Sequence, residues 1–228
     1  MKGFRPNGHL IVQIYKVGAP SIVVQAIGSL MTYGMNLILA AFGSAQTVFG
    51  IYFKLQSFVF MPVFGLNNGM VPIIAYNYGA GHKDRVIKTI KHSVAYGVGI
   101  MFVGLLAMHI FPAQLMRMFD AEESLIAIGA PALETISLSF VFAGFCIVAG
   151  SVFQALGNGV YSMIVSVARQ MCVLLPVAKL LSLSGEVTLI WWAFPIAELA
   201  SVLLTSYFLV RIYRKVICHI GEPVVQDA

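Results

Sequence analysis

Four ionisable residues lie inside long apolar runs of this 228-residue sequence: Lys54, Glu134, Arg169 and Glu198. If these runs cross a bilayer, each ionised side chain costs about 2.5 kcal/mol or more, even on the mildest insertion scale. Residues retained at that cost serve one of two purposes. They form buried ion pairs that join helices, or they belong to a site that binds and exchanges ions.

Their positions along the runs predict which of them meet. Arg169 and Glu198 lie on consecutive runs joined by a short turn, so the two helices are expected to be antiparallel neighbours. Counted from one end at about 1.5 Å per residue, Arg169 lies about 14 Å deep and Glu198 about 20 Å, a difference that long side chains cover. Lys54 and Glu134 each lie about 10–15 Å from the opposite end and are placed to face one another. Two interpretations stay open: a fixed pair that sets helix packing, and a carboxylate that alternates between its basic partner and a bound H⁺ or Na⁺.

The sequence lacks the motifs of enzymatic chemistry. The stretch GAGHKDR, residues 79–85, lacks the spacing of a phosphate-binding GxxxxGK[ST] loop, and its glycines are expected to end a helix instead. Ser151 has no GxSxG context, and the five histidines lie near the ends of apolar runs, which argues against a Ser-His pair within the membrane. The cysteines show no metal-ligand spacing and are expected to pack as small hydrophobic residues: Cys146, Cys172 and Cys218. We therefore expect neither an enzyme nor a metal or organic cofactor.

The composition indicates a membrane protein. Hydrophobic residues make up 59% of the chain and charged residues 10%, against about one quarter charged in soluble domains. A spanning helix needs about 20 mainly apolar residues, and the sequence offers six such runs, at about 11–41, 46–76, 88–111, 125–156, 160–183 and 187–211. The prediction is an all-α membrane protein whose six transmembrane helices form one domain, residues 11–217. An N-terminal segment, 1–10, and a tail, 218–228, flank this domain.

The basic residues predict the orientation of the chain. Most of the 14 Lys and Arg residues lie in three short segments beside apolar runs: Lys2, Arg5, Lys16, Lys83, Arg85, Lys88, Lys91, Arg211, Arg214 and Lys215. Lys and Arg accumulate on cytoplasmic loops, so we expect a multi-pass protein of the cell (inner) membrane with both termini in the cytoplasm. The same distribution argues against a nucleic-acid partner. On the outer side, residues 112–123 favour a short surface helix or, as an alternative, a polar loop.

Polar and large apolar side chains on the first two runs are candidates for lining a cavity. Amides that face the interior of a helix bundle either join helices or contact a ligand. Aromatic and Met side chains suit organic cations, and they suit lipid contact or ordinary packing equally well. The candidates are Asn36, Gln56, Phe60, Met61, Asn67 and Asn68.

The stretch MPVFGLNNGMVPIIAYNYGAGHKDR, residues 61–85, resembles the eighth helix and following loop of the multidrug and toxic compound extrusion (MATE) family. Its matching positions are Pro62, Gly65, Leu66, Gly69, Pro72, Ile73, Tyr76, Asn77, Tyr78, Gly79, Ala80 and Arg85. Further agreements occur in the same order along nearly the whole chain: Pro20, Asn36 and Gly43, then FQALGNG at 153–159, then Arg169 and Pro176.

The resemblance implies a fold of twelve helices in two six-helix lobes, of which this chain is similar to the second, C-terminal lobe. It also implies secondary active efflux of lipophilic cationic drugs or toxic metabolites by antiport with Na⁺ or H⁺, through a cavity between the lobes. The chain would then need an N-terminal six-helix half or a second copy of itself, in addition to the lipid bilayer. No cation site is carried over, because run 11–41 has no Asp or Glu and Glu134 lies near an outer helix end.

Two alternatives to drug efflux remain. The first is a lipid or polysaccharide-precursor flippase of the same superfamily, which would be expected to line its cavity with more basic residues; the candidates are Lys54 and Arg169. The second is a nonfunctional, structural membrane fragment whose charged residues only join helices.

Overall fold

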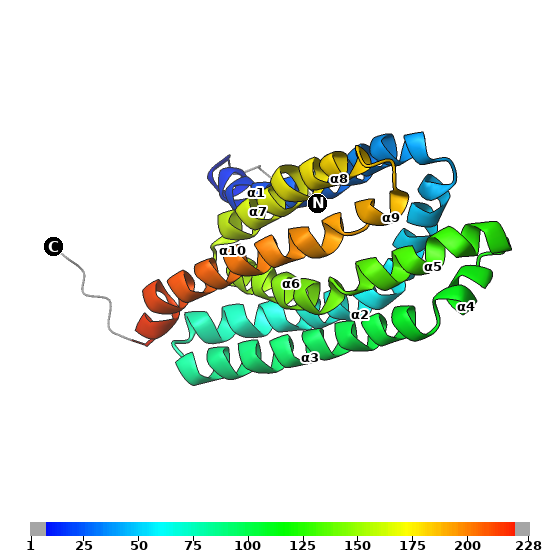
Figure 1. The fold of residues 1–228 in the computed structure, drawn as a ribbon. Coiled ribbons are helices and arrows are strands. Elements are labelled where there is room, and N and C mark those ends of the chain that lie inside the picture. The colour runs from blue at the N-terminus through cyan, green and yellow to red at the C-terminus, as the bar shows by residue number, and fades with distance from the viewer. Residues whose placement is uncertain (1–7, 222–228) are drawn as a thin grey trace, which may run out of the picture.

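The computed structural model describes residues 8–221, and its regular structure is helical throughout (Figure 1). The elements are α1 (Gly8–Leu39), η1 (Ala40–Phe42), α2 (Ala45–Gly79), α3 (Lys83–Ile110), α4 (Pro112–Arg117), α5 (Glu123–Ser137), α6 (Phe140–Ala155), α7 (Gly159–Val167), η2 (Ala168–Leu174), α8 (Leu175–Ser182), α9 (Val187–Ile190), α10 (Ala193–Lys215) and η3 (Ile217–His219). The predicted all-α class is confirmed. Most of the predicted terminal segments, 1–10 and 218–228, lies outside the described residues.

The long helices correspond to the six predicted runs. Five spans are long and apolar enough to cross a bilayer: Gly18–Phe42, Ala45–Gly79, Lys83–Ile110, Gly159–Ser182 and Val187–His219. The remaining run is divided between α5 and α6, which meet at 48°. Counting this bent pair as one span gives six, as the sequence predicts.

Serine hydroxyls accompany the break between α5 and α6. Ser137 Oγ donates to the carbonyl of Glu134 at 2.9 Å, and Ser139 Oγ donates to the carbonyl of Ile136 at 2.6 Å. Hydroxyls that bond back to the preceding turn bend helices. The bend therefore occurs where side chains compensate for the interrupted backbone ladder, as a bilayer requires.

Close contacts join α3 to α6 and α2 to α10. Glycines bring α3 against α6, because a Cβ on Gly144 would lie 3.0 Å from the carbonyl oxygen of Gly97 and 2.9 Å from Met101 Cγ. Small residues at such crossings let backbones approach, which is the main source of helix association in lipid. An aromatic cluster joins α2 to the end of α9 and the start of α10: the Phe49 ring lies 6.5 Å from Trp191 and 6.1 Å from Phe194, centroid to centroid.

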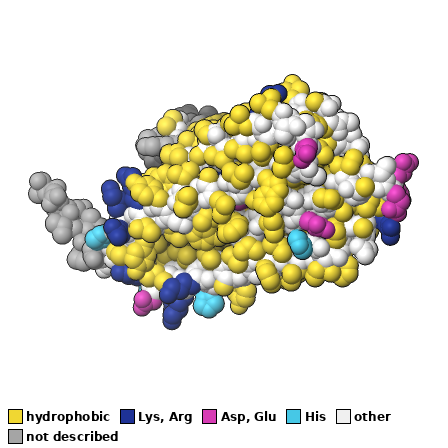
Figure 2. Space-filling model, viewed as in Figure 1, with side chains coloured by type: hydrophobic (Ala, Val, Ile, Leu, Met, Phe, Trp, Pro, Cys, Tyr) yellow, Lys and Arg dark blue, Asp and Glu magenta, His cyan; other side chains and the backbone are white. Residues whose placement is uncertain are grey.

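The two ends of the bundle carry different charges. Figure 2 shows most Lys and Arg gathered where α10 ends and α3 begins, with one acidic side chain among them, while several Asp and Glu lie toward the opposite end, near α4 and α5, beside one basic side chain. At the basic end, Gly81 has a φ of 74° and His82 N–H donates to the carbonyl of Asn77 at 2.9 Å. This is the geometry with which a glycine terminates a helix. The predicted helix end at GAGHKDR is therefore confirmed.

The predicted surface helix within residues 112–123 is also present. α4 begins at Pro112 and ends at Arg117. Beyond it, Arg117 Nη2 lies 2.9 Å from Glu123 Oε1, and both side chains are exposed. The segment is thus helical in its first half, and a surface ion pair joins α4 to the first turn of α5.

Candidate functional site

A cavity of about 990 Å³ opens between α1, α2, α6, α7, η2 and α10. Its size is at the upper end of the range for pockets that hold drug-sized molecules, about 300–1,000 Å³. The wall combines aromatic and Met side chains with scattered amides and hydroxyls. Such a wall suits an apolar molecule with a few polar or charged groups.

Five of the six predicted lining residues border this cavity: Gln56, Phe60, Met61, Asn67 and Asn68. Asn36 does not. Its Nδ2 donates to the carbonyl of Thr32 at 2.9 Å, and its own carbonyl accepts from Gln46 Nε2 at 2.8 Å. The Asn36 side-chain amide is therefore used within α1, and the Asn36 backbone carbonyl, through Gln46, connects the end of α1 to the start of α2.

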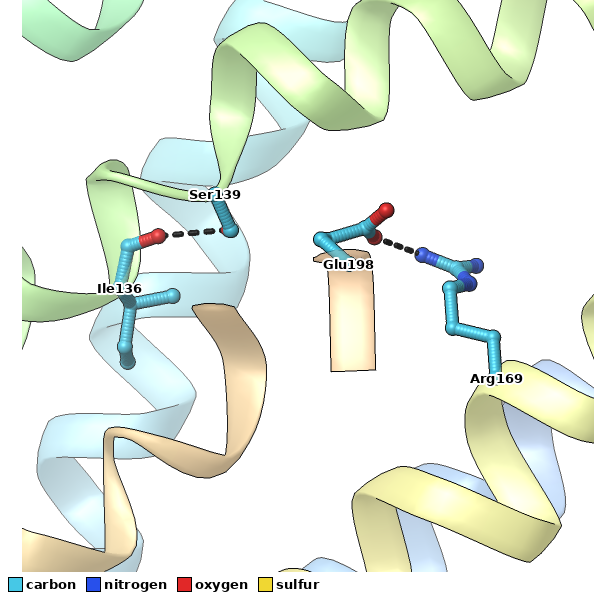
Figure 3. Close-up of polar contacts among 4 residues, drawn as sticks. All are labelled: Ile136, Ser139, Arg169 and Glu198. Atoms are coloured by element: carbon cyan, nitrogen blue, oxygen red, sulfur yellow. Dashed lines mark hydrogen bonds and ion pairs between the residues drawn. The ribbon is translucent and has the colours of Figure 1, made fainter. Parts of the chain in front are cut away.

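Arg169 and Glu198 form the predicted ion pair in the cavity wall. Arg169 Nη1 donates to Glu198 Oε1. Figure 3 shows Arg169 reaching from η2 toward Glu198 on α10, with the second carboxylate oxygen directed away from the guanidinium. The exposed fraction is 29% for the Arg169 side chain and 7% for Glu198, so the arginine is the more accessible partner. Breaking such a pair leaves a buried charge unless another cation takes the place of Arg169.

The helix around Arg169 has a π-helical segment, η2, which the sequence analysis did not anticipate. A π-helix bonds each N–H to the carbonyl five residues earlier, and π-segments are frequent at functional sites. Pro176, the second residue of α8, has no N–H to bond the carbonyl of residue 172. We attribute the wider segment to this missing donor. Arg169 lies within this segment, on the side that faces Glu198 of α10.

Two hydroxyl residues that the sequence analysis did not select continue the site along α10. Ser201 and Thr205 line the cavity and are each 1% exposed. Within residues 8–221, Glu198 Oε2 has no hydrogen-bond partner, while Ser201 Oγ and Thr205 Oγ1 have none among nitrogen and oxygen atoms and lie beside the Cys146 thiol. Buried oxygens of this kind are normally satisfied by water or an ion. The signal in the sequence was the spacing from Glu198, three and seven residues, which places all three on one helix face.

Lys54 and Glu134 do not form the ion pair that their similar depths in the membrane had suggested. Lys54 is exposed, and its Nζ lies 5.6 Å from the centre of the Phe119 ring. Glu134 is half-buried on α5, and neither residue lines the cavity. Among residues 8–221, the ion pairs are Arg117–Glu123 and Arg169–Glu198. The bend between α5 and α6 was not visible in the sequence, and it changes the direction of the helix that carries Glu134.

The sequence and the fold of this chain are similar to those of known membrane transporters. The family model MatE matches residues 20–180. The multidrug export protein MepA of Staphylococcus aureus is 27% identical over 196 residues, covering 85% of this chain and 43% of MepA. The MATE multidrug transporter DinF-BH has a solved structure that is 32% identical with a TM-score of 0.82, covering 93% of this chain and 48% of DinF-BH.

A structure of the Vibrio cholerae MATE transporter VcmN has the same fold as this chain. Its TM-score is 0.85 at 17% identity, covering 94% of this chain and 49% of VcmN. This chain therefore spans about half the length of the relatives that it matches.

Proposed function

The chain belongs to the MatE family, and from this premise we propose that it forms one six-helix lobe of an antiporter that expels lipophilic organic cations in exchange for Na⁺ or H⁺. The observation that carries the proposal is the pair of Arg169 and Glu198 in the wall of a largely apolar cavity. Multidrug export is the function named for its relative MepA. Members of this family are transporters rather than enzymes.

The proposed exchange uses the carboxylate of Glu198. In one state Glu198 is ionised and pairs with Arg169, and its second oxygen supplies negative charge to the cavity for a cationic substrate. In the other state H⁺ or Na⁺ binds this carboxylate and cancels that charge, so the substrate is held less tightly. The coupling is reciprocal, because the substrate and the ion compete for one negative charge. The apolar and aromatic wall binds the rest of the substrate.

A complete transport path requires a second lobe. Half of a cavity wall cannot open alternately to the two sides of a membrane, and transporters of this kind move one repeat against another. We propose that the partner is an N-terminal six-helix half or a second copy of this chain. In the proposed orientation, the basic end of the bundle and both termini face the cytoplasm.

A flippase for lipid or polysaccharide precursors is less well supported. Anionic cargo would favour several basic residues in the wall. Within the described residues, Arg169 is the only Lys or Arg that lines the cavity, and it is paired with a carboxylate. Lys54, the other candidate, lies outside it. A purely structural role for the ion pair is the remaining alternative. The experiment described next distinguishes this role from ion exchange at Glu198.

The test compares two carboxylate variants of the assembled transporter in vesicles. Glu198→Gln keeps an oxygen that accepts from Arg169, so we expect normal insertion, while gradient-driven efflux of a lipophilic cation is abolished. Glu134→Gln is the matched control, because Glu134 is another carboxylate within a span but lies outside the cavity. Unchanged efflux by Glu198→Gln would overturn the assignment. Equal loss in both variants would indicate a general effect of removing membrane carboxylates.

A further inference from the structure

A second groove, of about 480 Å³, lies between α2 and α3, apart from the cavity. On its α2 side are the exposed glycines Gly65 and Gly69, one helical turn apart. A Cβ at either position would have no neighbouring heavy atom within 4 Å. These glycines therefore do not serve close packing within this lobe, unlike Gly97 and Gly144. Their missing side chains leave the groove open.

Basic side chains occupy the end of the groove nearest the α2–α3 turn. Lys88 and His92 line it, are exposed, and lie one turn apart on α3. His92 Nδ1 lies 2.7 Å from the carbonyl of Lys88, so Nδ1 donates, and Nε2 of the neutral ring is left as an acceptor. Neither residue forms an ion pair with a carboxylate in the described part of the chain. Figure 2 shows this end of the molecule as its most basic region.

The groove runs from headgroup depth into the hydrocarbon. At about 1.5 Å per residue from the start of α3, Lys88 lies about 8 Å along the helix and Tyr96 about 20 Å. The α2 side of the groove is apolar, with Gly65, Leu66, Gly69, Met70 and Ile73, and Thr89, Ser93 and Tyr96 complete its α3 side. A cationic mouth above an apolar channel of this length complements an anionic headgroup joined to an acyl chain.

We propose that this groove binds one anionic phospholipid. Its phosphate lies against the Lys88 ammonium, beside His92, and one acyl chain lies along Gly65 and Gly69 in the space their side chains do not fill. Basic pockets between helices at the cytoplasmic side are a recognised form of headgroup recognition. The site is separate from the drug cavity and depends on neither the coupling ion nor the substrate.

The chain offers matched controls for both parts of the site. Lys91→Gln removes an exposed lysine from the same helix that does not line the groove, for comparison with Lys88→Gln. Gly99→Leu adds a side chain at another exposed α3 glycine with open space, for comparison with Gly69→Leu. None of the four substituted positions is closely packed or forms an ion pair in the described part of the chain. Each variant is first checked for an unchanged unfolding temperature in detergent without lipid.

The measurement is native mass spectrometry of the purified protein titrated with phosphatidylglycerol or phosphatidylcholine. We expect one phosphatidylglycerol to bind preferentially, with an affinity about fivefold lower in Lys88→Gln. Gly69→Leu should lose the bound lipid, while Lys91→Gln, Gly99→Leu and the charge-preserving Lys88→Arg should retain it. Equal effects of Lys88→Gln and Lys91→Gln, equal affinity for the two lipids, or retention by Gly69→Leu would each overturn the proposal. Binding of inorganic phosphate with the same affinity as the lipid would overturn it too, since the acyl chain would then contribute nothing.

Discussion

Glu198 is the residue on which the proposed mechanism depends. It is one of few carboxylates in the spans, it is 7% exposed by side chain, and it combines a guanidinium partner with an oxygen that no group in residues 8–221 satisfies. A carboxylate of this kind is paired with Arg169 through one oxygen and leaves the other oxygen for an ion. The neighbouring hydroxyls of Ser201 and Thr205 extend that capacity along α10.

The pair itself is expected to contribute to stability. Arg169→Leu leaves the Glu198 carboxylate buried and unpaired, which costs about 3 kcal/mol or more. The double variant Arg169→Leu with Glu198→Leu removes both charges, and an apolar replacement of a buried pair is often close to neutral. We therefore expect the double variant to recover most of the lost free energy of unfolding, measured by denaturant titration of the purified protein in detergent. Additive losses would show that the two residues are not coupled.

At this scale the sequence predicted the site in part. An ionised side chain is costly in an apolar run, so Arg169 and Glu198 could be selected as site residues from the sequence. The short turn between their helices predicted that the two residues lie close together. Ser201 and Thr205 could not be selected in the same way, because hydroxyls are common in membrane helices and usually bond to their own backbone. Asn36 shows the converse, since it was selected from the sequence but its side-chain amide donates to the Thr32 carbonyl within α1 and does not line the cavity.

At the scale of elements, interruptions in the helices position the site. Glu134 precedes the bend between α5 and α6 and forms no ion pair within residues 8–221, whereas Arg169 lies in the π-segment η2 and pairs with Glu198 on α10. Neither interruption was predicted, although the six apolar runs were. Apolar length determines that a span exists, whereas a bend or a wide turn depends on individual hydroxyls and prolines whose effect is decided by their neighbours.

The contact between α3 and α6 gives the prediction at this scale. Gly144→Ala places a methyl group 3.0 Å from the carbonyl of Gly97 and 2.9 Å from Met101 Cγ, so the helices must separate. We expect a loss of about 1–3 kcal/mol, seen as a lower unfolding temperature. Gly150→Ala on the same helix is the control, because its added methyl lies 3.7 Å from Ser162 Cβ, an ordinary contact. A stable Gly144→Ala variant would contradict the close packing described here.

At the scale of the whole molecule, the chain spans about half the length of the relatives that it matches, and it combines a cavity with charge separated between its ends. The chain covers 43% of MepA and 48% of DinF-BH. The sequence predicted this division because its resemblance was to the second lobe alone. The residues of one lobe form one half of the cavity wall. They do not determine whether an N-terminal half or a second copy of the chain forms the other half.

Orientation in the membrane is testable with single cysteines. In a variant lacking Cys146, Cys172 and Cys218, we expect His82→Cys to react with a membrane-impermeant maleimide only after the cells are permeabilised, because it lies at the basic end. Glu122→Cys, at the acidic end, should react in intact cells. Both native side chains are exposed, so burial does not confound the comparison. The opposite labelling pattern would reverse the proposed topology.

Counter-ion movement during efflux tests the central claim most directly. Vesicles containing the assembled transporter are loaded with a lipophilic cation, and no ion gradient is imposed. We expect outward substrate movement to drive Na⁺ or H⁺ inward, because the two compete at Glu198 and the coupling is reciprocal. We also expect Glu198→Gln to abolish this ion flux. Substrate leaving without counter-movement of either ion, or an ion flux that persists in Glu198→Gln, would contradict the account.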